Sequence, residues 1–174
     1  MNSDLRVQFI HGLEASPQGI KAQLFARHFT ALTPAMDPRD FEASVEVQRA
    51  ALSEFGPQVL VGSSYGGAIA VALLQRGLWR GPTLLLAQAA LRRGQPAELP
   101  EDVTVWLVHG VRDSIIGVED SRRLSQAGTP GRVRLFEVDD EHSLHSTVED
   151  GRLLGWVDAL GAEADQSKSV LSRP

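Results

Sequence analysis

The chain has 174 residues, of which 43% are hydrophobic and 22% charged, and its formal net charge is −5. This length and composition fit one soluble globular domain. Arg and Lys are scattered along the chain, so the basic patch that a nucleic-acid partner requires is not expected. The sequence contains no Cys, which excludes disulfides, cysteine nucleophiles and thiolate metal sites.

The first apolar run, Val7 to Ile10, is far too short for the core of a signal peptide or for a membrane span. We therefore expect a cytoplasmic protein with no membrane partner.

Strands and helices are predicted to alternate along the chain. In order, apolar runs and helical stripes predict a strand over 5–10, a helix over 18–29, a strand over 30–33, a helix over 41–55, a strand over 58–61, a helix over 66–77, strands over 83–86 and 103–108, a helix over 118–127, a strand over 132–138, and one closing helix with Val148, Leu153, Trp156, Val157 and Leu160 on its buried face.

Near-continuous apolar strands indicate a sheet that is covered on both faces. The predicted fold class is α/β, a three-layer, doubly wound and mostly parallel sheet of about six strands with helices on both faces. Residues 1–160 form the single domain, and residues 161–174 are expected to be a flexible C-terminal tail. In such a sheet, ligands bind beyond the carboxyl ends of the strands.

A Gly-Ser-Ser-Tyr-Gly-Gly segment, residues 62–67, joins the strand over 58–61 to the following helix. In that context the pattern G-x-S-x-G is typical of a nucleophile elbow, a sharp turn that lifts a serine hydroxyl above the sheet. The glycines relieve crowding in the turn. Ser64 is the predicted nucleophile, and an ordinary glycine-rich turn is the alternative.

A serine hydroxyl needs a general base, which in turn needs an acid to orient it. Asp113 lies just after the strand over 103–108, and His142 lies just after the last strand. The chain order Ser64, Asp113, His142 is that of α/β-hydrolases. Asp113 fits the loop geometry better than its rivals Glu98, Asp102 and Asp120, whereas His145 remains open as an alternative to His142.

An oxyanion hole requires two converging N–H donors. We expect the backbone N–H of Tyr65, next to the nucleophile, to be one, and that of Leu13, after the His11-Gly12 turn, to be the other.

These segments resemble the α/β-hydrolase superfamily, in particular its small esterase-like bacterial members that lack a lid. The resemblance extends to about Leu160 and includes His11-Gly12-Leu13 with Ser16-Pro17, the elbow, His109-Gly110 with Asp113, and Asp139-Asp140 leading to His142. It implies an acyl-enzyme mechanism, no cofactor, no metal, and carboxylic-ester or thioester substrates. Only 16 residues, 87–102, separate the strand over 83–86 from the next strand. This is too few for a lid domain.

The sequence thus predicts a carboxylesterase-like serine hydrolase acting on small soluble esters. Arg92 and Arg93 either face the pocket and favour an anionic substrate or, as is more common for a pair of arginines, form an exposed surface. The alternatives are an acyltransferase or peptidase with the same triad, a binding module without catalysis, and a phosphate-binding protein that uses the glycine-rich turn. The oligomeric state and the natural substrate are left open.

Overall fold

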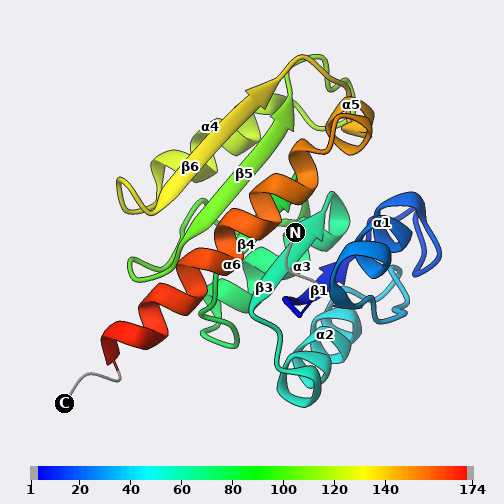
Figure 1. Ribbon diagram of the computed structural model, residues 1–174. Helices are drawn as coiled ribbons and strands as arrows, with labels where there is room; N and C mark the ends of the chain where they lie inside the picture. Colours follow the sequence, from blue (N-terminus) through cyan, green and yellow to red (C-terminus); the bar gives the residue numbers. More distant parts are fainter. Residues whose placement is uncertain (1–3, 172–174) are drawn as a thin grey trace.

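The computed structural model describes the backbone of residues 4–171 and the side chains of residues 4–164. Its centre is a sheet of six parallel strands in the order β2-β1-β3-β4-β5-β6, drawn in Figure 1. The strands are β1 (Arg6–Ile10), β2 (Thr30–Leu32), β3 (Val59–Ser63), β4 (Thr83–Leu86), β5 (Val105–Gly110) and β6 (Val133–Val138).

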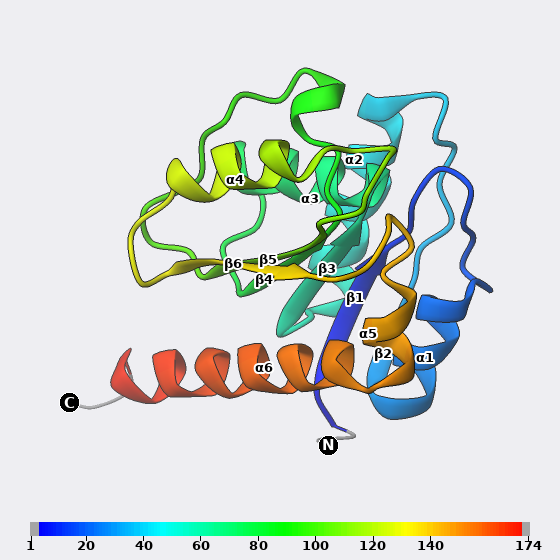
Figure 2. The same cartoon turned by 90° about the horizontal axis from the view of Figure 1, so that it is seen from above.

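The helices lie in two layers, one on each face of the sheet, as the view from above shows (Figure 2). One layer holds α1, α5 and α6, and the other holds α2, α3 and α4. The helices are α1 (Ile20–His28), α2 (Phe41–Phe55), α3 (Tyr65–Gln75), α4 (Val118–Gln126), α5 (His145–Glu149) and α6 (Arg152–Leu171), with a short 3₁₀ helix, η1 (Leu91–Arg93).

Successive side chains of each strand point to opposite faces of the sheet, and both faces are buried, which explains why the strands are apolar throughout. Val59 and Val61 of β3 pack into the core beneath α1 and α6, while Leu60 between them packs beneath α2 and α3. Because successive side chains point to opposite faces, a strand covered on both sides carries no polar face. The predicted three-layer, doubly wound parallel sheet is confirmed.

The chain winds outward from β1 to β2, then returns across β1 to β3 and continues to β6. The direction of winding therefore reverses between β1 and β3. The carboxyl ends of these two strands form the crevice in which doubly wound sheets bind ligands.

The predicted single closing helix is wrong, because two helices, α5 and α6, stand in its place. Gly151 has a φ of +79°, in the left-handed region that ends a helix. The carboxylate of Asp150 then accepts a hydrogen bond from the N–H of Arg152 at 3.0 Å, so the first N–H group of α6 has a partner.

Helix α6 runs past Gly161, where we expected the domain to end. Gly161 lies against the side chain of Leu5, and a Cβ at this position would lie 2.7 Å from the Leu5 methyl carbons. This glycine therefore serves a close contact and does not end the helix. Residues 172–174 lie outside the described part of the chain, and the flexibility expected of 161–174 stays a prediction.

Among the residues that the structure describes, no helix is both long enough and apolar enough to cross a membrane.

Candidate active site

Ser64 occupies the turn between β3 and α3 with a φ of +55° and a ψ of −114°. A positive φ costs a residue other than glycine about 1–3 kcal/mol, so the surroundings must hold it in place. The Ser64 N–H donates to Leu86 O at 2.8 Å, and the Ser64 carbonyl accepts from the N–H groups of Ala68 and Ala89 at 3.2 and 3.1 Å. Both backbone groups of Ser64 are thereby satisfied, and its side chain is free for chemistry.

Glycine is required on both sides of Ser64 because backbone passes directly over each position. A Cβ at Gly62 would lie 2.6 Å from Gly66 O, and a Cβ at Gly66 would overlap the backbone of Ile10. Contacts this short do not occur between real atoms, so the close crossing of β3, α3 and β1 excludes any side chain here. The turn has the geometry predicted for a nucleophile elbow.

The three predicted side chains form one chain of hydrogen bonds across the carboxyl ends of β3, β5 and β6. His142 Nε2 lies 2.9 Å from Ser64 Oγ, and His142 Nδ1 lies 2.7 Å from Asp113 Oδ2. The His142 side chain is 20% exposed, while that of Asp113 is fully buried. Of these two side chains, only that of His142 is therefore accessible to solvent.

Asp113 is held as a carboxylate by its hydrogen bonds. Burial alone would raise its pKa, but the hydrogen bond from His142 and those from the N–H groups of Ile116 and Ile115 outweigh burial, and the pKa lies below its usual value. Both N–H groups donate to Oδ1 at 2.9 Å. Oδ1 thus fixes the carboxylate in the loop after β5, and Oδ2 is turned toward His142.

The loop carrying His142 is held in place by Asp140, a residue of the Asp139-Asp140 segment to which the sequence pattern gave no role of its own. Asp140 Oδ1 accepts from the N–H of Glu141 at 2.8 Å, and Oδ2 accepts from the N–H and the hydroxyl of Ser146 at 2.8 and 2.6 Å. These bonds hold the pKa of Asp140 below its usual value against the opposing effect of burial. The signal available in sequence was an acid at a strand end, two residues before the histidine.

The competing residues lie elsewhere. His145 opens α5, is 63% exposed and pairs with Glu149 at 3.0 Å, so it does not approach Ser64. Of the rival acids, Asp102 pairs with Arg80 and Asp120 pairs with Arg92.

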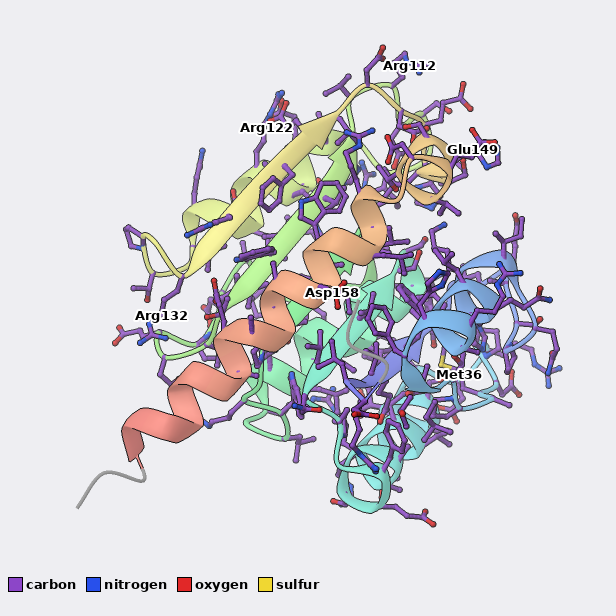
Figure 3. The ribbon with its side chains drawn as sticks, in the orientation of Figure 1. Met36, Arg112, Arg122, Arg132, Glu149 and Asp158 are labelled. Atoms are coloured by element: carbon purple, nitrogen blue, oxygen red, sulfur yellow. The ribbon has the colours of Figure 1, made fainter. Side chains whose placement is uncertain are left out.

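Charged side chains surround this end of the molecule. Figure 3 shows Arg112 beyond the tips of β5 and β6, and Glu149 on the neighbouring helix α5. Arg112 Nε pairs with Asp139 at 2.6 Å, so this guanidinium is engaged with the loop that precedes His142.

A cavity of about 370 Å³ opens above Ser64. Its walls come from the loops after β1, β3, β5 and β6 and from the start of α1, and are Gly12, Leu13, Glu14, Ala15, Lys21, Ser63, Ser64, Ile115, His142 and Ser143. Leu13 and Ile115, which are 43% and 67% exposed, give it an open apolar rim.

Lys21 contributes a basic side chain to the wall of this cavity. The sequence did not indicate this role, because the apolar stripe of the predicted helix shows only which residues face the core. Lys21 Nζ donates to Ser143 O at 2.6 Å, next to His142. Burial lowers the pKa of Lys21, against the opposing charge of Asp140.

Arg92 and Arg93, by contrast, are exposed and are not among the residues that line this cavity, so they take the second of the two arrangements considered from the sequence. Arg92 pairs with Asp120 at 2.8 Å. The guanidinium of Arg93 stacks over the ring of Tyr65, 5.0 Å from its centroid.

Leu13 lines the cavity, and Tyr65 is the first residue of α3, where N–H groups have no partner within the helix. Their role as oxyanion donors stays a prediction. Among the described side chains, no group of three or more His, Asp or Glu residues is arranged to hold a metal ion.

Comparison with models of protein families gives no match for this sequence, and comparison with curated proteins gives none. Solved structures do match. Monoacylglycerol lipase from Paleococcus ferrophilus superposes with a TM-score of 0.72 at 15% identity, covering 90% of this chain and 94% of that one.

Two further structures match at similar levels. Est1E from Butyrivibrio proteoclasticus gives a TM-score of 0.69 at 16% identity, covering 96% of this chain and 89% of that one. Alpha/beta hydrolase domain-containing protein 10 from mouse gives 0.66 at 17% identity, covering 96% and 90%. The chain therefore has the fold of the α/β-hydrolase superfamily, in a minimal form built on six parallel strands.

Proposed function

We propose that this protein is a serine hydrolase that cleaves small soluble carboxylic esters or thioesters through an acyl-enzyme intermediate. The observation that carries the proposal is the hydrogen-bonded series from Ser64 through His142 to Asp113, which begins at a strained turn and opens into a cavity. The names of the matching structures, a lipase, Est1E and an α/β hydrolase, support a hydrolytic enzyme.

In the proposed reaction, Ser64 Oγ attacks the carbonyl carbon while its proton moves to His142 Nε2. The N–H groups of Tyr65 and Leu13 stabilise the oxyanion that forms. The carbon–oxygen or carbon–sulfur bond to the leaving group then breaks, and His142 gives its proton to that group. Water, deprotonated by His142, attacks the acyl carbon and releases the acid and free Ser64.

The preference for small substrates follows from the size and openness of the cavity. About 370 Å³ lies at the low end of the volumes that enclose a small molecule. Between β4 and β5 the chain forms only η1 and irregular backbone, so no lid domain covers a long acyl chain. We therefore propose short-chain esters as the better substrates.

The test is covalent labelling with a fluorophosphonate, followed by intact-mass measurement of wild type, Ser64→Ala and Ser63→Ala. Ser63 is the matched control because it lines the same cavity and is the adjacent residue in the chain. We expect one adduct on wild type and Ser63→Ala and none on Ser64→Ala. Folded wild type without an adduct would reject the proposal in favour of a binding module.

Turnover of p-nitrophenyl esters tests the substrate class. We expect kcat/KM to be highest for acetate or butyrate and to fall for chains of twelve carbons or more. A preference for the long chains would contradict the proposed substrate class, while leaving the nucleophile assignment to the labelling experiment.

A further inference from the structure

Behind the triad, a second histidine reaches the same carboxylate. His109 lies near the end of β5, and its side chain is fully buried. Its Nε2 is 3.1 Å from Asp113 Oδ2, the oxygen that His142 Nδ1 contacts at 2.7 Å from the other side. Two imidazoles therefore converge on one oxygen, and only that of His142 lines the cavity.

The partners of His109 determine where its proton lies. Nε2 faces Ile116 O at 2.9 Å and Asp113 Oδ2, and both of these only accept, so Nε2 carries hydrogen. Nδ1 lies 2.7 Å from Ser121 Oγ, and a hydroxyl can donate to it. A neutral His109 protonated on Nε2 donates that hydrogen to Ile116 O, and the same N–H lies 3.1 Å from Asp113 Oδ2.

Gln88 fixes the direction of the Ser121 hydroxyl. Its Oε1 accepts from the N–H of Ala90 at 2.7 Å, which leaves its amide Nε2 to donate to Ser121 Oγ at 3.1 Å. Ser121 thus accepts from Gln88 and donates to His109. Every donor has an acceptor along this series, and Gln88, Ser121 and His109 are all buried, where an unsatisfied polar group would be costly.

Asp113 accepts three hydrogen bonds, two on Oδ1 and one on Oδ2, and His109 Nε2 lies against Oδ2 as a further polar contact at 3.1 Å. A carboxylate has about four lone-pair sites, so these three bonds and this contact leave the group little freedom to rotate. A neutral donor also brings no second positive charge near His142, which must itself become cationic during the reaction.

We propose that His109, held in its Nε2–H form by Ser121 and Gln88, is a positioning residue that locks the Asp113 carboxylate toward His142. This inference rests on the proposed function, because it concerns the same triad. His109 touches neither the cavity nor Ser64, and it acts through Asp113.

Two variants separate the role of the donor from the role of packing. His109→Leu removes both ring nitrogens, whereas His109→Gln keeps an N–H donor at a similar reach. We expect His109→Leu to lower kcat about 10- to 100-fold with KM unchanged, the range typical of groups that orient a reactive residue, and His109→Gln to recover most of this loss. His145→Leu, which removes an exposed histidine, is the matched control and should keep wild-type kcat.

A second readout does not depend on hydrolysis. The hydrogen between His142 Nδ1 and Asp113 gives a proton NMR resonance far downfield, assigned by its loss in His142→Ala. We expect it to shift or broaden in His109→Leu and to be unchanged in His145→Leu. If wild type does not react with the fluorophosphonate, the proposed function fails. The NMR result still shows whether His109 influences the bond between His142 and Asp113.

Folded His109→Leu with wild-type kcat and an unchanged resonance would overturn the inference. If His109→Leu does not fold, Ser121→Ala decides, because it removes only the hydroxyl that holds the His109 ring through Nδ1. In that variant a fall in kcat with a shifted resonance supports the positioning role, and wild-type values of both reject it.

Discussion

Single residues at this site are held in states that an isolated chain would avoid. Ser64 has a positive φ, Asp113 is a buried carboxylate, and His142 is held between them. Each state is stabilised by its neighbours through backbone hydrogen bonds or by a partner side chain. Such arrangements are stable only when the surrounding fold supplies the missing free energy, and they concentrate at reactive sites.

Replacing the acid tests whether this orientation matters for the rate. In Asp113→Asn the amide oxygen stays where Oδ1 now accepts two backbone N–H groups, so the amide NH2 faces His142. His142 must then present a lone pair to that NH2 and hydrogen to Ser64, which is the wrong tautomer for a base. We expect kcat to fall about 10⁴-fold with KM little changed, measured on a short ester. Activity within tenfold of wild type would contradict the assignment.

For single residues, the sequence predicts the position of a side chain wherever that position follows from a local motif or from the end of a strand. Ser64, Asp113 and His142 were chosen from a turn motif and from strand ends, and the structure brings the three together. The approach of His109 to Asp113 depends on how the loop after β5 folds back. The sequence pattern places His109 at a strand end but does not show that its side chain meets Asp113, because hydrophobic periodicity carries no information on how a loop folds back.

Among the elements, the strands were predicted to within two residues, since an apolar run between turn residues is a local signal. The closing helices were not, because their boundaries depend on tertiary contacts. Gly151 ends α5, whereas Gly161 lies inside α6 against Leu5. The same residue type thus ends one helix and serves close packing in the next.

Two glycine-to-alanine changes within helices should have opposite effects. A Cβ at Gly66 in α3 would overlap the backbone of Ile10, whereas a Cβ at Gly155 in α6 meets nothing within 4 Å. We expect Gly66→Ala to lose about 3 kcal/mol or more of unfolding free energy and Gly155→Ala to gain about 0.5–1 kcal/mol from helix propensity. Urea denaturation measures both. Equal effects of the two would show that β1 and α3 are not in close contact.

Over the whole molecule, the topology determines where these residues meet. The winding reverses between β1 and β3, so the loops that carry Gly12 and Ser64 lie side by side at one edge of the sheet. Asp113 and His142 reach the same edge because β5 and β6 are parallel to β3. Alternating apolar runs made this architecture predictable, since both faces of a parallel sheet must be buried.

The acids at this edge make stability depend on pH. The pKa values of Asp113 and Asp140 lie below the ordinary value of 3.8 in the folded protein, so near that pH the unfolded chain binds more protons than the folded one. Their contribution is present above the unfolded value and is lost as the pH falls through the folded values. We expect the unfolding free energy to be level near neutrality and to decline below about pH 4.

Asp140→Asn isolates one part of this effect. It replaces a buried carboxylate that accepts three hydrogen bonds, so we expect a loss of about 1.5–3 kcal/mol at pH 7 and a shallower decline in acid. Asp37→Asn is the control: ion pairing with Arg39 lowers the pKa of Asp37 to about 2, but the pair is exposed, so its effect should be small and vanish in high salt. If Asp140→Asn kept the wild-type acid slope at every salt concentration, the acid sensitivity would have to arise away from the loop that carries His142.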